Sequence, residues 1–167
     1  MLFVLTGNGK GKTTSAIGMS IRMLGSGNKV CFIQFIKGME YSEINALKNY
    51  GEDIQTFVMG RKCFIKEDPE DKDYEKAEQA WKLFLDKVQE GFNFIVLDEL
   101  NIALFFKLLD LDMVIETLSR LSKEIDIVVT GRYAPSQMID IADMVTEMNE
   151  IKHHYYSGVS ARKGIEY

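Results

Sequence analysis

A glycine-rich segment at residues 6–14, "TGNGKGKTT", constrains this sequence more than any other feature. It follows a short apolar run and precedes a helical pattern, which is the setting of a phosphate-binding loop between a strand and a helix. The common pattern is a glycine, four residues and then Gly-Lys-Thr. Residues 11–13 supply the second half, but Thr6 stands where the first glycine is expected, and glycine comes one place later at Gly7. The sequence therefore predicts a phosphate-binding loop with unusual spacing.

The residue types of this loop suit a nucleotide triphosphate. Glycines let backbone N–H groups turn toward phosphate oxygens, and the helix that follows adds its positive end. Lys12 is expected to contact phosphate, and the hydroxyl of Thr13 is expected to reach Mg²⁺. Lys10 and Thr14 are further donors. A glycine-rich turn without a ligand is disfavoured, because the strand, the helix and the Lys-Thr pair are all in place.

Apolar runs alternate with helical patterns along the rest of the chain. The runs are apolar throughout, which is typical of strands buried on both faces of a parallel sheet. Strands are predicted at Leu2–Thr6, Lys29–Phe35, Ile54–Val58, Asn93–Asp98, Ile125–Thr130 and near Met144–Met148. Helices are predicted at Lys12–Leu24, Ser42–Asn49, Pro69–Glu90, Asn101–Leu121 (which can break near Asp110) and Pro135–Ile141.

This order predicts one domain over residues 1–167 with an α/β fold. The expected architecture is P-loop NTPase-like (RecA-like) and doubly wound, with a mostly parallel sheet of about six strands flanked by helices. Within the third helix, Asp68 is predicted as the N-cap and Pro69 as the first helical residue. Trp81 falls on an apolar stripe and is interpreted as a core residue. The acidic run at residues 66–78, "KEDPEDKDYEKAE", is interpreted as the solvated start of this helix rather than a metal site.

Ligands of such folds bind at the carboxyl ends of the strands. The fourth strand ends in Asp98 and Glu99, an acidic pair of the kind that holds Mg²⁺ in P-loop proteins; an acidic helix cap is the alternative. Arg132 follows the fifth strand, where a guanidinium can grip phosphate in two places. Gln34 and Lys37 end the second strand at the same edge.

No nucleophile triad is apparent in the sequence. His153 and His154 are adjacent, so in a strand they would point to opposite faces and would not form a metal pair. The formal net charge of −5 disfavours a nucleic-acid partner. No apolar run is long enough to span a membrane, and the first residues do not resemble a secretion signal, so a cytoplasmic location is expected.

The chain resembles the P-loop type of ATP:corrinoid adenosyltransferase. Matching pieces occur in order from residue 6 to residue 167: "TGNGKGKTT", "QFIKG", "VLDELN", "TGRYAP", "ADMVTEM", "IKH" and "GVSARKGIEY". The family's own loop has the form "GNGKGKTT", which accounts for the unusual spacing. The resemblance implies that Co(I) of a reduced corrinoid attacks the 5′ carbon of ATP, a cobalt–carbon bond forms and triphosphate leaves intact.

The resemblance also implies the substrates, cofactors and partners. These are ATP, Mg²⁺ (or Mn²⁺), a corrinoid such as cobalamin, cobinamide or cobyrinic acid diamide, a reduced flavin protein as electron donor, and a second copy in a homodimer. The residues implied to bind the nucleotide are Gly7, Asn8, Gly9, Lys10, Gly11, Lys12, Thr13, Thr14, Arg22 and Arg132, with Arg22 alternatively only solvating the end of its helix. Lys12, Thr13, Glu99 and Arg132 are the implied catalytic residues, and Thr13, Asp98 and Glu99 the implied metal ligands.

Two departures from the family pattern affect the corrinoid side. Many members carry an N-terminal extension that helps cover the corrinoid across the homodimer, and this sequence starts at the first strand, so the cover is expected from elsewhere. Many members also place Phe-x-Trp after the third strand, where the aromatics keep an axial ligand off cobalt. Phe64 and Ile65 are the nearest counterparts here and are predicted to form an apolar floor; a surface loop is the alternative.

Other functions remain open at this point. A P-loop kinase or ATPase acting on a small molecule would release ADP rather than triphosphate. A nucleotide-gated corrinoid-binding module would hold the corrinoid without forming a cobalt–carbon bond. A DNA-dependent motor is disfavoured by the net charge and the size of the chain.

Overall fold

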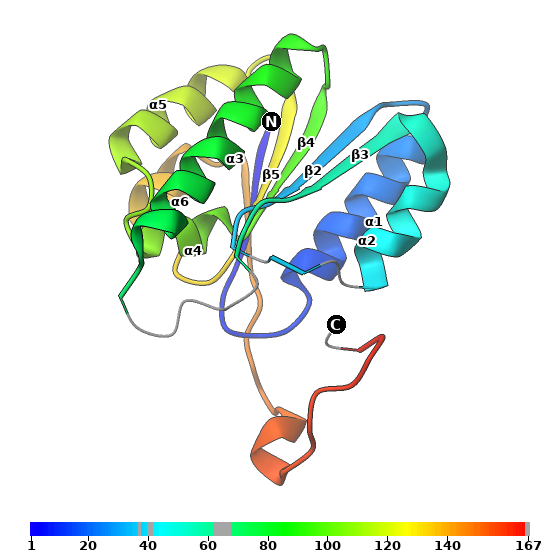
Figure 1. Cartoon of the computed structure of the whole chain (residues 1–167), viewed down its shortest axis with the longest axis vertical. Helices are drawn as coiled ribbons and strands as arrows, with labels where there is room; N and C mark the ends of the chain where they lie inside the picture. The colour runs from blue at the N-terminus through cyan, green and yellow to red at the C-terminus, as the bar shows by residue number, and fades with distance from the viewer. Residues whose placement is uncertain (37, 40–41, 62–67, 166–167) are drawn as a thin grey trace.

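The computed structural model describes residues 1–36, 38–39, 42–61 and 68–165. Its centre is a sheet of six strands in the order β3-β2-β4-β5-β1-β6, and every described pair is parallel (Figure 1). The predicted α/β class and six-stranded parallel sheet are confirmed. The strands are β1 Leu2–Thr6, β2 Val30–Gln34, β3 Ile54–Val58, β4 Phe94–Asp98, β5 Asp126–Thr130 and β6 Met144–Glu147.

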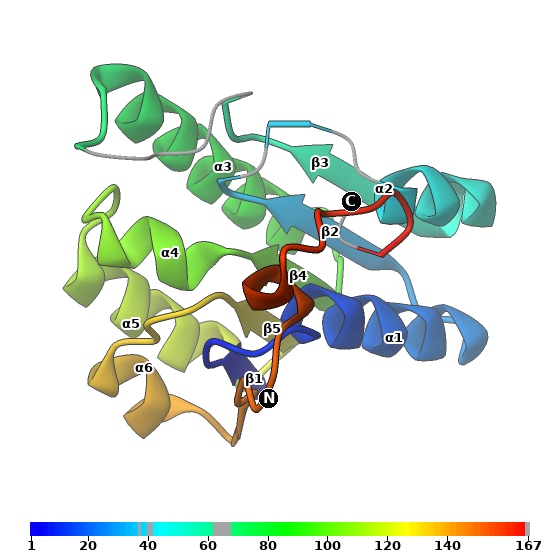
Figure 2. The same ribbon diagram turned by 90° about the horizontal axis from the view of Figure 1, so that it is seen from below.

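Helices cover both faces of the sheet (Figures 1 and 2). One face carries α1 and α2, and the other carries α3 to α6. The helices are α1 Lys12–Gly25, α2 Ser42–Leu47, α3 Asp71–Gln89, α4 Leu100–Phe105, α5 Leu111–Leu121 and α6 Ser136–Ile141, with 3₁₀ helices η1 Lys48–Asp53 and η2 His154–Ser157. Over the described part of the chain, none of these helices has the length and apolar character that crossing a membrane requires.

Successive side chains along a strand join two different hydrophobic cores, one on each face of the sheet. In β4, Ile95 and Leu97 join the core beneath α3, α4 and α5, whereas Phe94 and Val96 join the core beneath α1 and α2. Successive side chains of a strand point to opposite faces, so burial on both faces produces a run that is apolar throughout. Cys31 lies in the first core, where burial raises the pKa of its thiol to about 12 and keeps it protonated at neutral pH.

The third helix begins later than predicted, because a different residue caps it. Glu70, rather than Asp68, is the N-cap, and Pro69 lies before the helix. The backbone N–H of Glu70 donates to the carboxylate of Asp73 at 2.9 Å, while the side chain of Glu70 accepts from the backbone of Asp73. This reciprocal pair satisfies two N–H groups that a helix start otherwise leaves unpaired. The prediction that Asp68 caps the helix and that Pro69 is its first residue is therefore wrong.

Asp73 should contribute measurably to stability. Its buried carboxylate accepts the N–H of Glu70 and pairs with Arg61 at 3.2 Å. In Asp73→Ala we expect the free energy of unfolding, measured by urea denaturation, to fall by about 1–2 kcal/mol. Asp71→Ala removes an exposed acid from the same helical turn and should lose only about 0.3 kcal/mol. Equal losses in the two variants would contradict the capping assignment.

The long helix predicted at Asn101–Leu121 divides into α4 and α5 near Asp110, at the place where a break was expected. The carboxylate of Asp110 caps α5 by accepting the N–H of Met113 at 2.8 Å. Lys107 has a φ of 55°, which turns the chain between the two helices. The predicted helix at Ser42–Asn49 ends earlier than expected and continues as η1.

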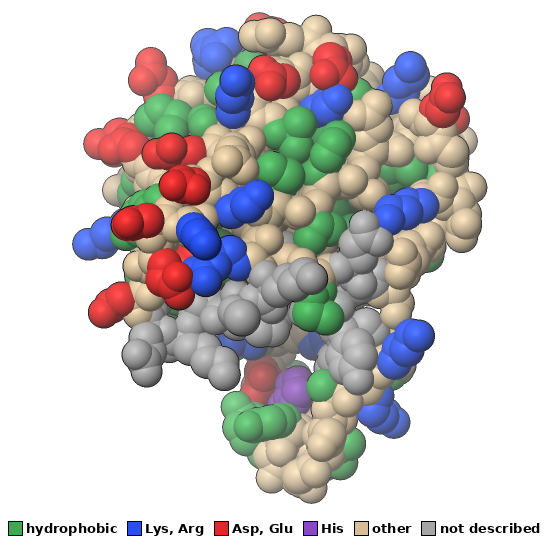
Figure 3. Space-filling view, in the orientation of Figure 1, with side chains coloured by type: hydrophobic (Ala, Val, Ile, Leu, Met, Phe, Trp, Pro, Cys, Tyr) green, Lys and Arg blue, Asp and Glu red, His purple; other side chains and the backbone are tan. Residues whose placement is uncertain are grey.

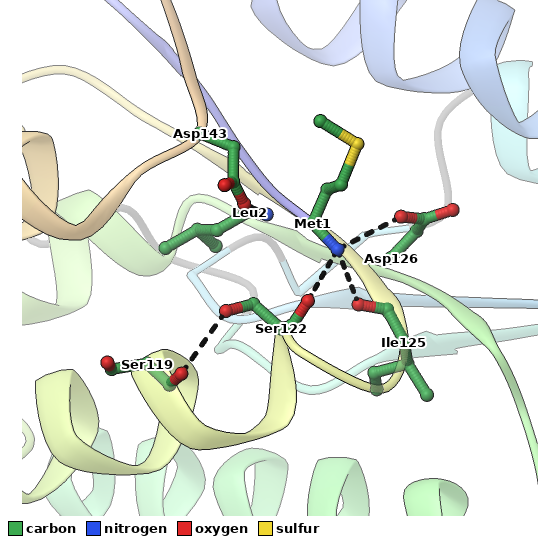
Figure 4. A network of polar contacts seen from close by, with 7 residues as sticks. All are labelled: Met1, Leu2, Ser119, Ser122, Ile125, Asp126 and Asp143. Atoms are coloured by element: carbon green, nitrogen blue, oxygen red, sulfur yellow. Dashed lines mark hydrogen bonds and ion pairs between the residues drawn. The ribbon is translucent and has the colours of Figure 1, made fainter.

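A polar network fixes the amino end of β1 (Figure 4). The amino group of Met1 donates to the carbonyl oxygens of Ser122 at 2.6 Å and Ile125 at 2.9 Å. It also pairs with the carboxylate of Asp126 at 3.1 Å. These contacts join β1 to the start of β5 and the end of α5. They lie at the end of β1 that is far from the glycine-rich loop, so they hold the strand in register without entering the site.

The order of the strands decides which loops meet. β5 lies between β1 and β4 and pairs with both. The carboxyl ends of parallel strands share one edge of the sheet, so the segments that follow β1, β4 and β5 are brought to neighbouring positions. Those segments hold the glycine-rich loop, the acidic pair and Arg132.

Candidate functional site

The glycine-rich loop packs directly on the backbone that follows β6. The N–H of Gly9 donates to the carbonyl oxygen of Met148 at 2.6 Å. A Cβ added at Gly7 would lie 2.5 Å from that oxygen, and one at Gly9 would lie 2.7 Å from it, so neither position has room for a side chain. Gly7 and Gly11 also have φ values of 90° and 119°, which favour glycine. Thr6 still belongs to β1, and this explains why the first glycine comes one place later than in the common pattern.

Lys12 folds back over the loop from the first turn of α1. Its Nζ donates to the carbonyl oxygens of Gly7 at 2.7 Å and Gly9 at 2.8 Å. Gly11 is the N-cap of α1, and the first turn of this helix holds no acidic side chain. The helix therefore presents its positive end and a lysine ammonium at the same loop, which together favour an anionic ligand.

Asp98 is buried at the end of β4 and joins three other elements. Its carboxylate accepts the hydroxyl of Thr13 at 2.8 Å, the hydroxyl of Thr130 at 2.7 Å and the side-chain amide of Gln34 at 3.0 Å. Thr13 belongs to α1, Thr130 ends β5 and Gln34 ends β2. The phosphate loop and the acidic pair, predicted from separate motifs, thus meet at one carboxylate. Thr130 was not among the predicted site residues, although a polar residue at the end of an apolar strand is a signal that could have identified it.

Glu99 stands in a strained backbone conformation. Its φ of 62° lies in the left-handed region, which costs a non-glycine residue about 1–2 kcal/mol. Its N–H donates to the hydroxyl of Thr130 at 3.0 Å, and this contact helps to hold the turn. Glu99 occupies the N-cap position of α4, but its side chain makes no capping hydrogen bond and instead lines a cavity. Glu99 therefore occupies the cap position of α4 with its backbone, but its carboxylate does not cap the helix.

The cavity at this edge of the sheet has a volume of about 880 Å³. Its charged and polar lining contains Asn8, Gly9, Lys10, Gly11, Lys12, Thr13, Thr14, Glu99 and Arg132, all of them predicted site residues. Its apolar lining includes Ile17 and Ile21 of α1, Ala46 and Leu47 of α2, and Ile36, Ile102 and Phe106 near the ends of β2 and α4. A cavity lined by both charged and apolar residues suits a ligand that is part phosphate and part apolar organic group.

Some residues predicted to belong to the site are not among those that line this cavity in the described structure. Arg22 is exposed in the last turn of α1 and does not line it. The helix carries Arg22 about 15 Å along its axis from Lys12, which explains why the structure does not bring it to the loop. Phe64 and Ile65, the predicted apolar floor, lie outside the described residues, as does Lys37.

The C-terminal segment, residues 148–165, crosses the carboxyl edge of the sheet (Figure 2). His153, Gly164 and Ile165 line the cavity, and Lys10 of the phosphate loop donates to the carbonyl oxygen of Ile165. Sequence analysis assigned no role to these residues. The condition under which His153 and His154 would point to opposite faces is not met, because this stretch is not a strand: His154 begins η2, and the two rings stack with their centroids 4.5 Å apart.

The oxygen atoms at the acidic pair fit a hard divalent cation. The hydroxyl of Thr13 and the carboxylates of Asp98 and Glu99 are donors of the type that Mg²⁺ prefers. Oε1 of Gln34 is buried beside Asp98 without a hydrogen-bond partner, so it can accept from a water that a metal ion holds. Over the described ranges, no cluster of three or more His, Cys, Asp or Glu side chains forms a complete metal cage. That is compatible with Mg²⁺, which proteins commonly hold through one or two carboxylates plus substrate phosphates.

Comparison with known proteins gives a consistent result. The model of the family described as ATP:corrinoid adenosyltransferase BtuR/CobO/CobP matches residues 1–167. A corrinoid adenosyltransferase of Pseudomonas aeruginosa is 41% identical over 169 residues, which cover 100% of this chain and 83% of that protein. Corrinoid adenosyltransferases of a Sinorhizobium species and of Escherichia coli are 34% and 32% identical over 171 residues, which cover 100% of this chain and 80% and 85% of those proteins.

Proposed function

This chain belongs to the ATP:corrinoid adenosyltransferase family, and we propose that the cavity described above is where it transfers the 5′-deoxyadenosyl group of ATP to a reduced corrinoid. The observation that carries this assignment is the meeting of the phosphate loop with Asp98 through Thr13, at the edge of a cavity with both charged and apolar walls. The phosphate loop supplies a triphosphate site, and the cavity supplies room for the organic part of a substrate.

The reaction requires stabilisation of a leaving group rather than a base. The electron pair of Co(I) forms the bond from cobalt to C5′ of ATP, the C5′–O bond breaks, and its electron pair leaves with intact triphosphate. No proton is removed from either substrate, which agrees with the missing nucleophile triad. Negative charge develops on the oxygen that leaves C5′, so fixed positive groups around the triphosphate lower the barrier.

We assign triphosphate binding to the phosphate loop, Lys12 and Arg132. Backbone N–H groups of the loop and the positive end of α1 act together there. The ammonium of Lys12 lies over the loop, where it can exchange its contacts with the carbonyl oxygens of Gly7 and Gly9 for phosphate oxygens. Arg132 lines the cavity after β5 and can bind a phosphate or the ribose. The loop residues with this role are Asn8, Gly9, Lys10, Gly11, Lys12, Thr13 and Thr14, with Gly7 shaping the turn.

We infer that Mg²⁺, or Mn²⁺, is held by Thr13, Asp98 and Glu99 together with phosphate oxygens. When bound there, the ion neutralises part of the charge on the triphosphate. The contacts of Asp98 with Gln34 and Thr130 fix its carboxylate, and Glu99 lines the cavity beside it. These supports are the protein's contribution to the metal site.

ATP is proposed to lie with its terminal phosphate where many P-loop proteins hold an inner one. The reacting atom is the ribose carbon, which has to face the corrinoid rather than the loop. Ile36, Ile102 and Phe106 supply apolar lining near the ends of β2 and α4, and this supports a corrin ring on that side. A nucleotide complex in which C5′ faces away from these residues would contradict the orientation.

Other parts of the assignment rest on the family resemblance. They are the homodimer, the reduced flavin protein as electron donor, and the choice among cobalamin, cobinamide and cobyrinic acid diamide as corrinoid. The apolar floor from Phe64 and Ile65 also stays a prediction, because these residues lie outside the described ranges.

The test is a product analysis under anaerobic conditions. We would mix the protein with ATP, Mg²⁺ and chemically reduced cob(I)alamin, follow the light-sensitive spectrum of adenosylcobalamin, and separate the phosphate products. We expect adenosylcobalamin and triphosphate in equal amounts. ADP without a cobalt–carbon product would indicate phosphoryl transfer, and a bound but unaltered corrinoid would indicate a binding module.

A further inference from the structure

We propose that His153 donates a hydrogen bond from its Nε2 to the bound triphosphate of ATP and thereby positions the leaving group. The identity of the ligand rests on the proposed function. The assignment of His153 goes beyond it, because the residue comes from the C-terminal segment rather than from any strand end or phosphate-loop motif.

The C-terminal segment is attached to the phosphate loop at two separate points. At its start, Met148 accepts the N–H of Gly9 and donates its own N–H to Thr6. Near its end, the carbonyl oxygen of Ile165 accepts Nζ of Lys10. His153 lies between these two anchors and lines the cavity. In the space-filling view, a hollow separates part of the C-terminal segment from the body of the molecule (Figure 3).

The contacts of the imidazole ring decide which nitrogen can donate. The backbone N–H of Tyr155 donates to Nδ1 of His153 at 3.1 Å, so this nitrogen acts as an acceptor. In a neutral imidazole the proton is then on Nε2. The ring is also stacked on His154 at 4.5 Å and meets the edge of Tyr156 at 6.3 Å, so its orientation is fixed from two sides. A ring that lines the cavity, with Nδ1 already used, has Nε2–H as its hydrogen-bond donor.

The surroundings point to phosphate as the acceptor. The phosphate loop contributes Lys10 and Lys12 to the same cavity, and Arg132 adds a third cation. A hydrogen bond with Glu150 raises the pKa of Tyr156, three residues after His153, and the Arg132 guanidinium opposes this rise to a smaller extent. His153 and Arg132 line the same cavity. An N–H donor among three cations suits an anionic ligand with several oxygens.

The experiment compares variants by the affinity of the whole protein for magnesium tripolyphosphate and for magnesium ATP, measured by calorimetry. His153→Phe keeps a ring for stacking on His154 but removes the donor, and we expect about tenfold weaker binding of both ligands. His153→Gln keeps an N–H near the position of Nε2 and should stay within about threefold of the wild type. Tyr155→Phe is the matched control, because it alters an exposed side chain of the same turn and keeps the backbone N–H.

Each outcome decides the proposal. Weaker binding in His153→Phe, with near-normal binding in His153→Gln and Tyr155→Phe, supports it. Equal losses in the phenylalanine and glutamine variants would assign His153 a purely structural role and overturn it, as would wild-type binding in both. If the wild type forms no adenosylcobalamin but His153→Phe still weakens tripolyphosphate binding, the proposed function fails and the role of His153 stands.

Discussion

Replacing Lys12 by methionine is expected to lower kcat/KM for adenosyl transfer by about a thousandfold. The lysine ammonium lies over the phosphate loop, bonded to the carbonyl oxygens of Gly7 and Gly9. In the proposed reaction it faces the triphosphate, whose negative charge increases as the C5′–O bond breaks. Methionine has a similar length but no charge and no donor. The loss should therefore be concentrated in the transition state, with kcat falling more than KM rises.

The measurement is steady-state formation of adenosylcobalamin from pre-reduced cob(I)alamin, so that cobalt reduction does not limit the rate. Lys29→Met is the matched control, because Lys29 is an exposed lysine just before β2, at the opposite end of the strands from the loop. It should leave kcat/KM within about twofold of the wild type. Urea denaturation should show that Lys12→Met loses at most about 2 kcal/mol of unfolding free energy, since it removes two partly buried hydrogen bonds. Near-normal turnover in Lys12→Met would exclude the triphosphate from this loop.

The sequence was most informative where one local pattern determines one local structure. The strand before Gly7, the helix after Lys12 and the apolar runs of the sheet all follow from periodicity and glycine placement, and the structure has them within a few residues. The acidic pair after β4 could be placed beside the phosphate loop because parallel strands share a carboxyl edge. The break near Asp110 was visible because aspartate is a good helix cap.

Features set by contacts between distant residues were not predictable in the same way. The third helix starts at Asp71 because Glu70 and Asp73 form a reciprocal cap, and that choice among several acidic residues is made by geometry. Thr130 reaches Asp98 only because β5 lies beside β4 in the sheet. His153 lies at the cavity because the backbone at Met148 packs on the phosphate loop, a contact with no local sequence signal.

Replacing Asp98 by asparagine should lower the activity of the protein much more than its stability. The carboxylate accepts hydrogen bonds from Thr13, Thr130 and Gln34. An asparagine oxygen can keep the two hydroxyl contacts, and its amide N–H can donate to Gln34 once the side-chain amide of Gln34 turns over. That rotation directs Oε1 of Gln34, which has no hydrogen-bond partner, toward residue 98. We therefore expect Asp98→Asn to change the free energy of unfolding by only about 1 kcal/mol.

Activity should respond far more than stability, because the substitution removes the negative charge that we propose holds the metal ion. We expect kcat/KM to fall by a factor on the order of a hundred or more at a fixed Mg²⁺ concentration, and the Mg²⁺ concentration for half-maximal rate to rise at least tenfold. Asp112→Asn, which neutralises an exposed carboxylate in the first turn of α5, is the control for net charge and should change neither quantity. An unchanged Mg²⁺ dependence with a large loss of unfolding free energy would make Asp98 a structural residue. The hydrogen bond from Thr13 to Asp98 would then serve only the structure. The metal ion would have to be held by Glu99 and the phosphates without Asp98.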